Sequence, residues 1–139
     1  PRRPEEHPLL GLISCVAPLM AVGNTLVAVP SEGGALLAAD LYPLLETSDV
    51  PGGVVNLVTG LRREVVGTLA AHDGVDGIWY FGPDPEESAA VERASAGNLK
   101  RTWVSHGLLR DWLDPARGEG EELLREATQV KNIWVPYGA

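Results

Sequence analysis

Apolar and polar residues follow one another in blocks along the chain, and the blocks switch between helical and extended periodicity. Pro8–Met20 is an apolar run that predicts a largely buried helix, and Gly23 and Asn24 end it. Thr25–Val29 is rich in β-branched residues and stops at a proline, as a buried strand does. Leucines then recur at helical spacing, which places a second helix near Ala35–Thr47.

The same alternation continues through the middle of the chain. It predicts strands over Val54–Thr59, Gly77–Phe81 and Lys100–Val104, with a helix over Arg63–His72 and another from Asp84 or Pro85 to near Gly97. Strands that alternate with helices of about ten or more residues indicate βαβ crossovers. The pattern therefore predicts an α/β fold with a mostly parallel sheet and helices on both faces.

Ligands of such a sheet bind in the crevice at the carboxyl ends of its strands. We expect those ends at Val29–Ser31, Thr59–Gly60, Phe81–Gly82 and Ser105–His106.

The pattern changes after Gly107, so the chain divides into a domain of residues 1–107 and a C-terminal segment, residues 108–139, predicted to serve packing or oligomerisation. The predicted elements of this segment are a short helix over Leu108–Leu113, a polar hinge over Asp114–Gly120, an amphipathic helix over Glu121–Thr128 with acidic residues in its first turn, and a last strand over Lys131–Val135 closed by Pro136–Gly138.

Composition narrows the possible functions. The 139 residues are 45% hydrophobic, which is enough for one domain with a core. A net charge of −8 makes nucleic acid and anionic membrane poor partners, because both reward clustered lysine and arginine. No apolar run reaches the roughly 20 residues of a membrane span. One cysteine excludes an internal disulfide, which suits a cytoplasmic protein.

Two motifs carry a resemblance to a known family. Ala17–Glu32 reads APLMAVGNTLVAVPSE and Pro51–Gly60 reads PGGVVNLVTG, and both resemble the cofactor-binding half of the aldehyde dehydrogenase superfamily. Asn98–Arg101, NLKR, adds to the likeness, which covers about Pro8–Gly107 and implies a Rossmann-like cofactor domain. Ala127–Gly138 is similar to the end of the shortened, non-catalytic C-terminal domain in the family-sixteen branch.

The resemblance also implies which cofactor-binding residues of the family are replaced in this chain. The lysine that holds the adenosine ribose in the family corresponds to Val29, which cannot donate a hydrogen bond. The family's F-T-G-S, where a helix N-terminus packs on the pyrophosphate, corresponds to the segment that ends in Gly82, Pro83 and Asp84. Pro83 lacks an N–H and Asp84 places a negative charge where a phosphate would sit, so both oppose dinucleotide binding.

The catalytic groups that the resemblance implies are missing as well. The general-base glutamate corresponds to Ser105, and the nucleophilic cysteine would follow Gly107 in a catalytic domain that the chain lacks. Cys15 lies in the apolar first helix, where a small buried hydrophobe is expected. We therefore expect that this chain is not an enzyme, although its parent protein is a candidate aldehyde dehydrogenase.

Four residues remain candidates for a vestigial NAD site: Ser31, Glu32, Gly60 and Gly82. Helix capping is the alternative for the first two, and tight strand-to-helix turns for the two glycines. No metal is expected, because the three histidines lack ligand spacing.

The remaining candidate residues have simpler explanations. Ser105 and His106 are adjacent on a strand and point to opposite faces, which argues against a hydrolase pair. Trp79 and Trp103 are expected in the core, and Trp112 and Trp134 are left open between core and interface.

The leading prediction is a non-catalytic pseudo-aldehyde-dehydrogenase domain for assembly, oligomerisation or protein interaction, with no cofactor. Its expected partners are a catalytic aldehyde dehydrogenase domain of the same protein, a second copy of itself in a homo-oligomer, or other proteins, with Lys131–Val135 as a strand added to a neighbouring sheet. The alternative is a part of an NAD-dependent aldehyde oxidoreductase that retains cofactor binding or modulates a catalytic domain.

Overall fold

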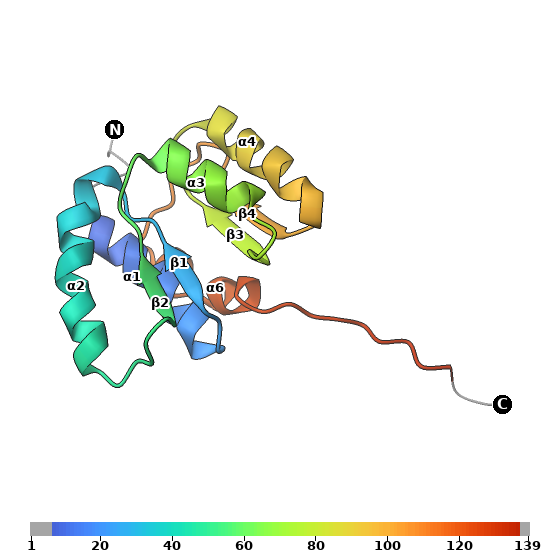
Figure 1. The fold of residues 1–139 in the computed structure, drawn as a ribbon, viewed down its shortest axis with the longest axis horizontal. Coiled ribbons are helices and arrows are strands. Elements are labelled where there is room, and N and C mark those ends of the chain that lie inside the picture. The colour runs from blue at the N-terminus through green and yellow to red at the C-terminus, as the bar shows by residue number, and fades with distance from the viewer. Residues whose placement is uncertain (1–6, 137–139) are drawn as a thin grey trace.

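The computed structural model describes residues 7–136 of the chain (Figure 1). The helices are α1 Pro8–Ala21, α2 Ala35–Thr47, α3 Arg62–Ala71, α4 Pro85–Ser95, α5 Pro115–Gly118 and α6 Glu121–Glu126, with 3₁₀ turns η1 Glu32–Gly34 and η2 Ala96–Asn98. The strands are β1 Leu26–Ala28, β2 Val55–Leu57, β3 Gly77–Tyr80 and β4 Arg101–Val104. The first six residues of the predicted N-terminal domain, and Tyr137 and Gly138 after the predicted last strand, lie outside the described residues.

The α/β fold with parallel strands is confirmed. Strand β1 pairs in parallel with β2, with Leu26 opposite Val55, and β3 pairs in parallel with β4, with Gly77 opposite Arg101. A helix crosses over between the strands of each pair, as parallel pairing requires. The hydrogen bonds form two separate two-stranded ladders in the described residues rather than one continuous sheet.

The best-packed core lies between the β3–β4 ladder and helices α3 and α4. Its buried members are Ala70, Ile78, Tyr80 and Val91, and partly buried Val66, Leu69 and Val104 pack against them. Ile78 and Tyr80 share one face of β3 because successive side chains point to opposite faces. Trp79 therefore lies on the other face, away from α3 and α4.

Helices α1 and α2 form where they were predicted, but the expected burial of α1 is wrong. Only Ser14 and Val16 of α1 are buried, and only Ala38 of α2. Leu36 of α2 is 83% exposed. Helical spacing identifies an apolar face, but it does not supply the element that would cover that face. Both helices therefore leave apolar surface open.

The C-terminal segment corrects three predictions. Leu108–Leu113 forms no helix. The predicted hinge contains a short helix, α5. Asp114 caps the N-terminus of α5 by accepting a hydrogen bond from the Ala116 N–H at 3.0 Å. The amphipathic helix is confirmed as α6. Lys131–Val135 is extended but pairs with no described strand, because a single extended segment needs a sheet edge to become a β-strand.

The NLKR motif has a structural role in this chain. Lys100, only 8% exposed, donates hydrogen bonds from Nζ to the carbonyl oxygens of Ala70 at 2.7 Å and His72 at 2.8 Å. The Asn98 side chain donates to the carbonyl of Asp73 at 3.1 Å. These bonds satisfy the open C-terminal carbonyls of α3, where a positive charge is also favoured by the helix dipole.

We predict that Lys100→Met lowers the free energy of unfolding by about 1–3 kcal/mol, because it leaves buried carbonyls without donors. Urea unfolding followed by tryptophan fluorescence measures the change. Lys131→Met on the exposed tail is the matched control, expected to shift stability by less than about 0.5 kcal/mol. Equal stability of the Lys100 variant and the wild type would contradict this role.

Candidate functional site

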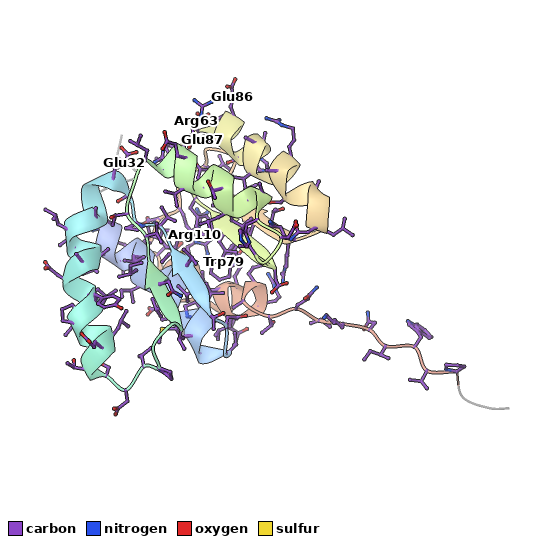
Figure 2. The ribbon with its side chains drawn as sticks, in the orientation of Figure 1. Glu32, Arg63, Trp79, Glu86, Glu87 and Arg110 are labelled. Atoms are coloured by element: carbon purple, nitrogen blue, oxygen red, sulfur yellow. The ribbon has the colours of Figure 1, made fainter. Side chains whose placement is uncertain are left out.

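The four predicted site residues follow three different strands and lie at the carboxyl ends of the parallel ladders. Ser31 and Glu32 begin η1 after β1, Gly60 precedes α3, and Gly82 precedes α4. Figure 2 shows Glu32 toward the same end of the molecule as the labelled side chains of α3 and α4. The topology therefore brings these loops to one edge, which we call the carboxyl edge.

At this edge, the N-terminus of α4 is closed by the chain itself. Asp84 is the N-cap residue, and its Oδ1 accepts a hydrogen bond from the Glu86 N–H at 2.8 Å. Pro83 and Pro85 have no N–H to offer. One N-terminal amide, that of Glu86, and the positive end of the helix dipole are thus already matched with a carboxylate.

A partly buried chain of polar side chains links β3, α3 and α4. Tyr80 donates a hydrogen bond from its hydroxyl to Glu87 Oε2, and Arg62 Nε pairs with the same carboxylate oxygen at 3.3 Å. Burial first, and then this hydrogen bond, raise the pKa of Tyr80 above its usual range, so the phenol stays a donor. Burial lowers the pKa of Arg62, but the charges of Tyr80 and Glu87 outweigh it and raise the pKa overall.

Sequence reasoning missed the three members of this chain. Arg62 and Glu87 lie 25 residues apart on different helices, so no local spacing could signal their pairing.

The structure gives Gly82 a different role from the tight turn that was expected. A Cβ at this position would overlap the hydroxyl end of Tyr80, so glycine is needed for the close approach of that ring. At Gly60 the steric conflict is smaller, because an added Cβ would lie 3.1 Å from Val65 Cγ2. Neither glycine has the positive φ that a left-handed turn would require.

Side-chain capping by Ser31 is also not observed. Ser31 occupies the N-cap position of η1, but its side chain makes no capping hydrogen bond. Its backbone carbonyl accepts from the Gly34 N–H at 2.8 Å, while the buried Oγ has no partner among the described residues. Glu32 is exposed in the first turn of η1 and acts on Arg62 through its charge.

The remaining positions at this edge form no catalytic pair. Ser105 donates from Oγ to the Gly82 carbonyl at 3.2 Å, whereas His106 Nε2 lies 3.6 Å from Glu92 on the exposed surface. The two neighbours therefore face different partners. β4 ends at Val104 and His106 has a positive φ of 49°, so the expectation that the pair lies on a strand is wrong. Val29 directly follows β1 and is half-buried.

On the opposite face of β3 and β4, the C-terminal segment builds an aromatic cluster around Arg110. Its guanidinium lies over the rings of Trp103 at 4.8 Å, Trp112 at 5.4 Å and Phe81 at 5.5 Å. The same group donates to the Arg117 carbonyl and pairs with Glu122 at 2.8 Å. Cation–π contact and charge pairing thus attach the C-terminal segment to the sheet face.

This cluster contains three of the four tryptophans. Trp79 and Trp103 pack edge to face at 5.0 Å, and Trp112 packs against Phe81 at 5.4 Å. All three are half-buried, so the expectation that Trp79 and Trp103 lie in the core is wrong. Trp134 is 94% exposed.

Cys15 belongs to α1 and lies near Arg110. Burial raises the pKa of its thiol to about 12, and the Arg110 charge offsets only part of this. The thiolate, which is the nucleophilic form, is therefore scarce at neutral pH.

The hollows of the described chain lie away from the carboxyl edge. One, of about 330 Å³, lies where β1 and β2 begin, beside Thr25 and Val54. The other, of about 570 Å³, lies between α1 and the α5–α6 segment. Ser31, Glu32, Gly60 and Gly82 line neither of them.

Within residues 7–136, no group of three or more histidine, cysteine or acidic residues is placed to hold a metal ion. In the same range, no helix is both long and apolar enough to cross a membrane.

Comparison with known proteins identifies the family. The sequence pattern of the Aldehyde dehydrogenase family matches residues 4–107. The chain therefore belongs to this family, with residues 108–139 beyond the matched part.

Individual relatives agree with this assignment. The chain is 33% identical over 104 residues to the NADP/NAD-dependent aldehyde dehydrogenase PuuC of Escherichia coli strain K12, a stretch that is 75% of this chain and 21% of that protein. It is 39% identical over 104 residues to the betaine aldehyde dehydrogenase of Bacillus subtilis strain 168, with the same coverage of 75% and 21%. The chain thus spans about a fifth of the length of these relatives.

A solved structure shows the same fold. The crystal structure of an aldehyde dehydrogenase from Bartonella henselae superimposes with a TM-score of 0.61 at 28% identity, covering 66% of this chain and 19% of that one.

We predict that Gly82→Ala lowers the free energy of unfolding by about 1–3 kcal/mol, because the added Cβ collides with the Tyr80 ring. In a Tyr80→Phe background, which removes the colliding hydroxyl, the same substitution should cost less. Gly52→Ala is the control, since its Cβ would meet no atom within 4 Å. An equal cost in both backgrounds would contradict the proposed packing.

Because the pKa of Cys15 is about 12 in the folded chain against 9.0 for a free thiol, the unfolded chain releases its proton first as pH rises. The free energy of unfolding should therefore be unaffected by this group below about pH 9 and fall between about pH 9 and pH 12. Cys15→Ala should reduce the early part of this fall in the free energy of unfolding. Urea unfolding at a series of pH values between about pH 9 and pH 12 measures the change. An unchanged slope would show that the thiol is not desolvated.

Proposed function

We propose that this chain is a non-catalytic domain of the aldehyde dehydrogenase family that serves assembly, by packing against a catalytic domain or a second copy of itself. The observation that carries the proposal is the closed N-terminus of α4. Asp84 Oδ1 accepts from the Glu86 N–H in the first turn of the helix, and Pro83 and Pro85 have no N–H to offer. A pyrophosphate would have to displace a bonded carboxylate and then meet its negative charge.

Other positions agree with the loss of chemistry. Beside Gly82, the Tyr80 hydroxyl and Arg62 Nε are both bonded to the Glu87 carboxylate. Where the family resemblance implies a ribose-holding lysine and a general base, the chain has Val29 and Ser105. The one thiol, Cys15, is held in its unreactive form. Together these residues support a domain that does not oxidise aldehydes.

The assembly role rests on apolar surface that the described chain leaves open. Val130, Ile133, Trp134 and Val135 of the extended tail are exposed, as are leucines of α2. Exposed apolar groups of this extent mark interaction sites. Aromatic anchors such as Trp134 dominate the binding energy of many interfaces. The proposed partners are a catalytic aldehyde dehydrogenase domain upstream in a protein of the family-sixteen branch, in the cytoplasm, and further copies of the domain.

A second candidate function is supported by a separate observation. The relatives include an NADP/NAD-dependent aldehyde dehydrogenase. In this chain the buried Ser31 Oγ at the end of β1 has no partner among the described residues, so a hydroxyl remains free to contact a ligand. Under this alternative the domain is part of an NAD-dependent oxidoreductase and retains weak cofactor binding or modulates a catalytic domain.

Calorimetric titration of the 139-residue chain with NAD and NADH separates the two candidates. We expect no binding heat at millimolar cofactor and no quenching of the tryptophans. Ser31→Ala should behave as the wild type, and a triple variant, Val29→Lys with Pro83→Ser and Asp84→Ala, should gain measurable affinity. Micromolar binding by the wild type that Ser31→Ala weakens would reject the non-catalytic assembly role in favour of the alternative.

A further inference from the structure

An apolar groove lies between α1 and the α5–α6 segment, on a part of the molecule away from the carboxyl edge. Its volume is about 570 Å³. Its walls come from two stretches of the chain, because α6 and α5 both pack against α1. The large apolar side chains that line it, and that define what we call the α1 groove, are Leu10, Ile13, Trp112, Leu113, Leu123 and Leu124.

The walls of the α1 groove are held by packing behind them. The Trp112 ring packs edge to face on Phe81 at 5.4 Å, and the Arg110 guanidinium lies 5.4 Å from the centre of the same ring. On the α1 side, a Cβ added at Gly11 would lie 2.9 Å from Trp112 Nε1, so helix and indole are already in close contact. Leu123 is only 2% exposed. A ligand would therefore meet walls that are already ordered, which lowers the entropy cost of binding.

A single charged residue, Glu119, is found among the residues that line the α1 groove. None of the ion pairs of the described residues includes it. Its backbone N–H donates to the Pro115 carbonyl at 3.1 Å, and the neighbouring Gly118 approaches the Trp112 carbonyl so closely that an added Cβ would overlap it. The backbone that carries this carboxylate is thus fixed at the groove, and its charge attracts a cation.

The size of the α1 groove indicates the class of its occupant. Pockets for small organic molecules have volumes of about 300–1,000 Å³, with mostly apolar walls and a few polar groups. The α1 groove, at about 570 Å³ and with one carboxylate, falls within this description. A standard protein interface takes about 20–30 residues from each partner, which is more than line this groove. Its dimensions therefore favour a small molecule over a second protein.

We propose that the α1 groove binds a small organic amine, with its alkyl or aryl body between α1 and α6 and its ammonium group paired with Glu119. The apolar body leaves water while the ammonium donates to a carboxylate, so both ends of one molecule are satisfied at once. An anion of the same shape would meet a like charge. The groove lies away from the carboxyl edge, so the inference goes beyond the assembly function and does not rest on it.

Three probes with the same apolar body and different head groups test the inference: phenylbutylamine as the cation, phenylbutanol as the neutral molecule and phenylpentanoate as the anion. Each is titrated into the isotope-labelled 139-residue chain at neutral pH and low salt, and the backbone amide resonances of α1 and of residues 112–124 report the binding. The amine should bind about two- to fivefold more tightly than the alcohol, and the carboxylate most weakly. In about 1 M salt the preference for the amine should shrink, because the charges are screened.

Variants of exposed residues separate the charge from the apolar walls without disturbing the fold. Glu119→Gln keeps the shape of the side chain and should abolish the preference for the amine, while leaving the affinity for phenylbutanol unchanged. Glu121→Gln is the matched control, since Glu121 is also exposed but does not line the groove. Ala17→Phe, at an exposed position that does line it, should fill the groove and weaken all three probes.

Several outcomes would overturn the inference. Equal affinities for the three probes, or a preference for the amine that survives Glu119→Gln, would remove the role of the carboxylate. No shift in the groove resonances at millimolar amine, or shifts that Ala17→Phe leaves unchanged, would remove the site. Groove resonances that move with protein concentration in the absence of any probe would show that another copy of the chain occupies the groove. The assembly function would stand in each of these cases.

Discussion

The structure depends most on how the chain closes the carboxyl edge of its parallel strands with its own side chains. Asp84 caps the N-terminus of α4, and beside it the Tyr80 ring packs on Gly82 while its hydroxyl donates to Glu87. The first of these contacts occupies the Glu86 N–H, a helix N-terminal donor of the kind that binds anions. The same contacts hold α4 and α3 on the β3–β4 ladder. Stability and the proposed loss of cofactor affinity therefore rest on the same contacts.

The opposite face of the same ladder is closed by residues beyond the family match. Arg110 lies over the Trp103 ring at 4.8 Å and pairs with Glu122, which draws the segment after β4 onto α1. A guanidinium that is stacked on aromatic rings and hydrogen-bonded at its edge keeps its charge at little desolvation cost. The segment after Gly107 is thus a packed part of the fold up to Ala127. Beyond Ala127, the tail side chains Val130, Ile133 and Trp134 are largely exposed.

The proposed loss of chemistry is accompanied by open apolar surface in the described residues. The chain spans about a fifth of the length of the relatives it matches. The C-terminal segment covers the aromatic face of β3 and β4 but leaves the groove beside α1 and the leucines of α2 exposed. Apolar surface that no internal element covers favours association.

The sequence by itself determined the α/β class, the positions of the helices and strands up to β4, and the family, because hydrophobic periodicity and local motifs are written along the chain. It also located Asp84 at a helix N-terminus. Only the tertiary structure decided that Tyr80, Glu87 and Arg62 meet, that Arg110 joins the aromatic cluster, and that Lys131–Val135 has no strand partner. These features depend on contacts between residues far apart in sequence. The pattern of apolar and polar residues along the chain does not specify which distant surfaces come together.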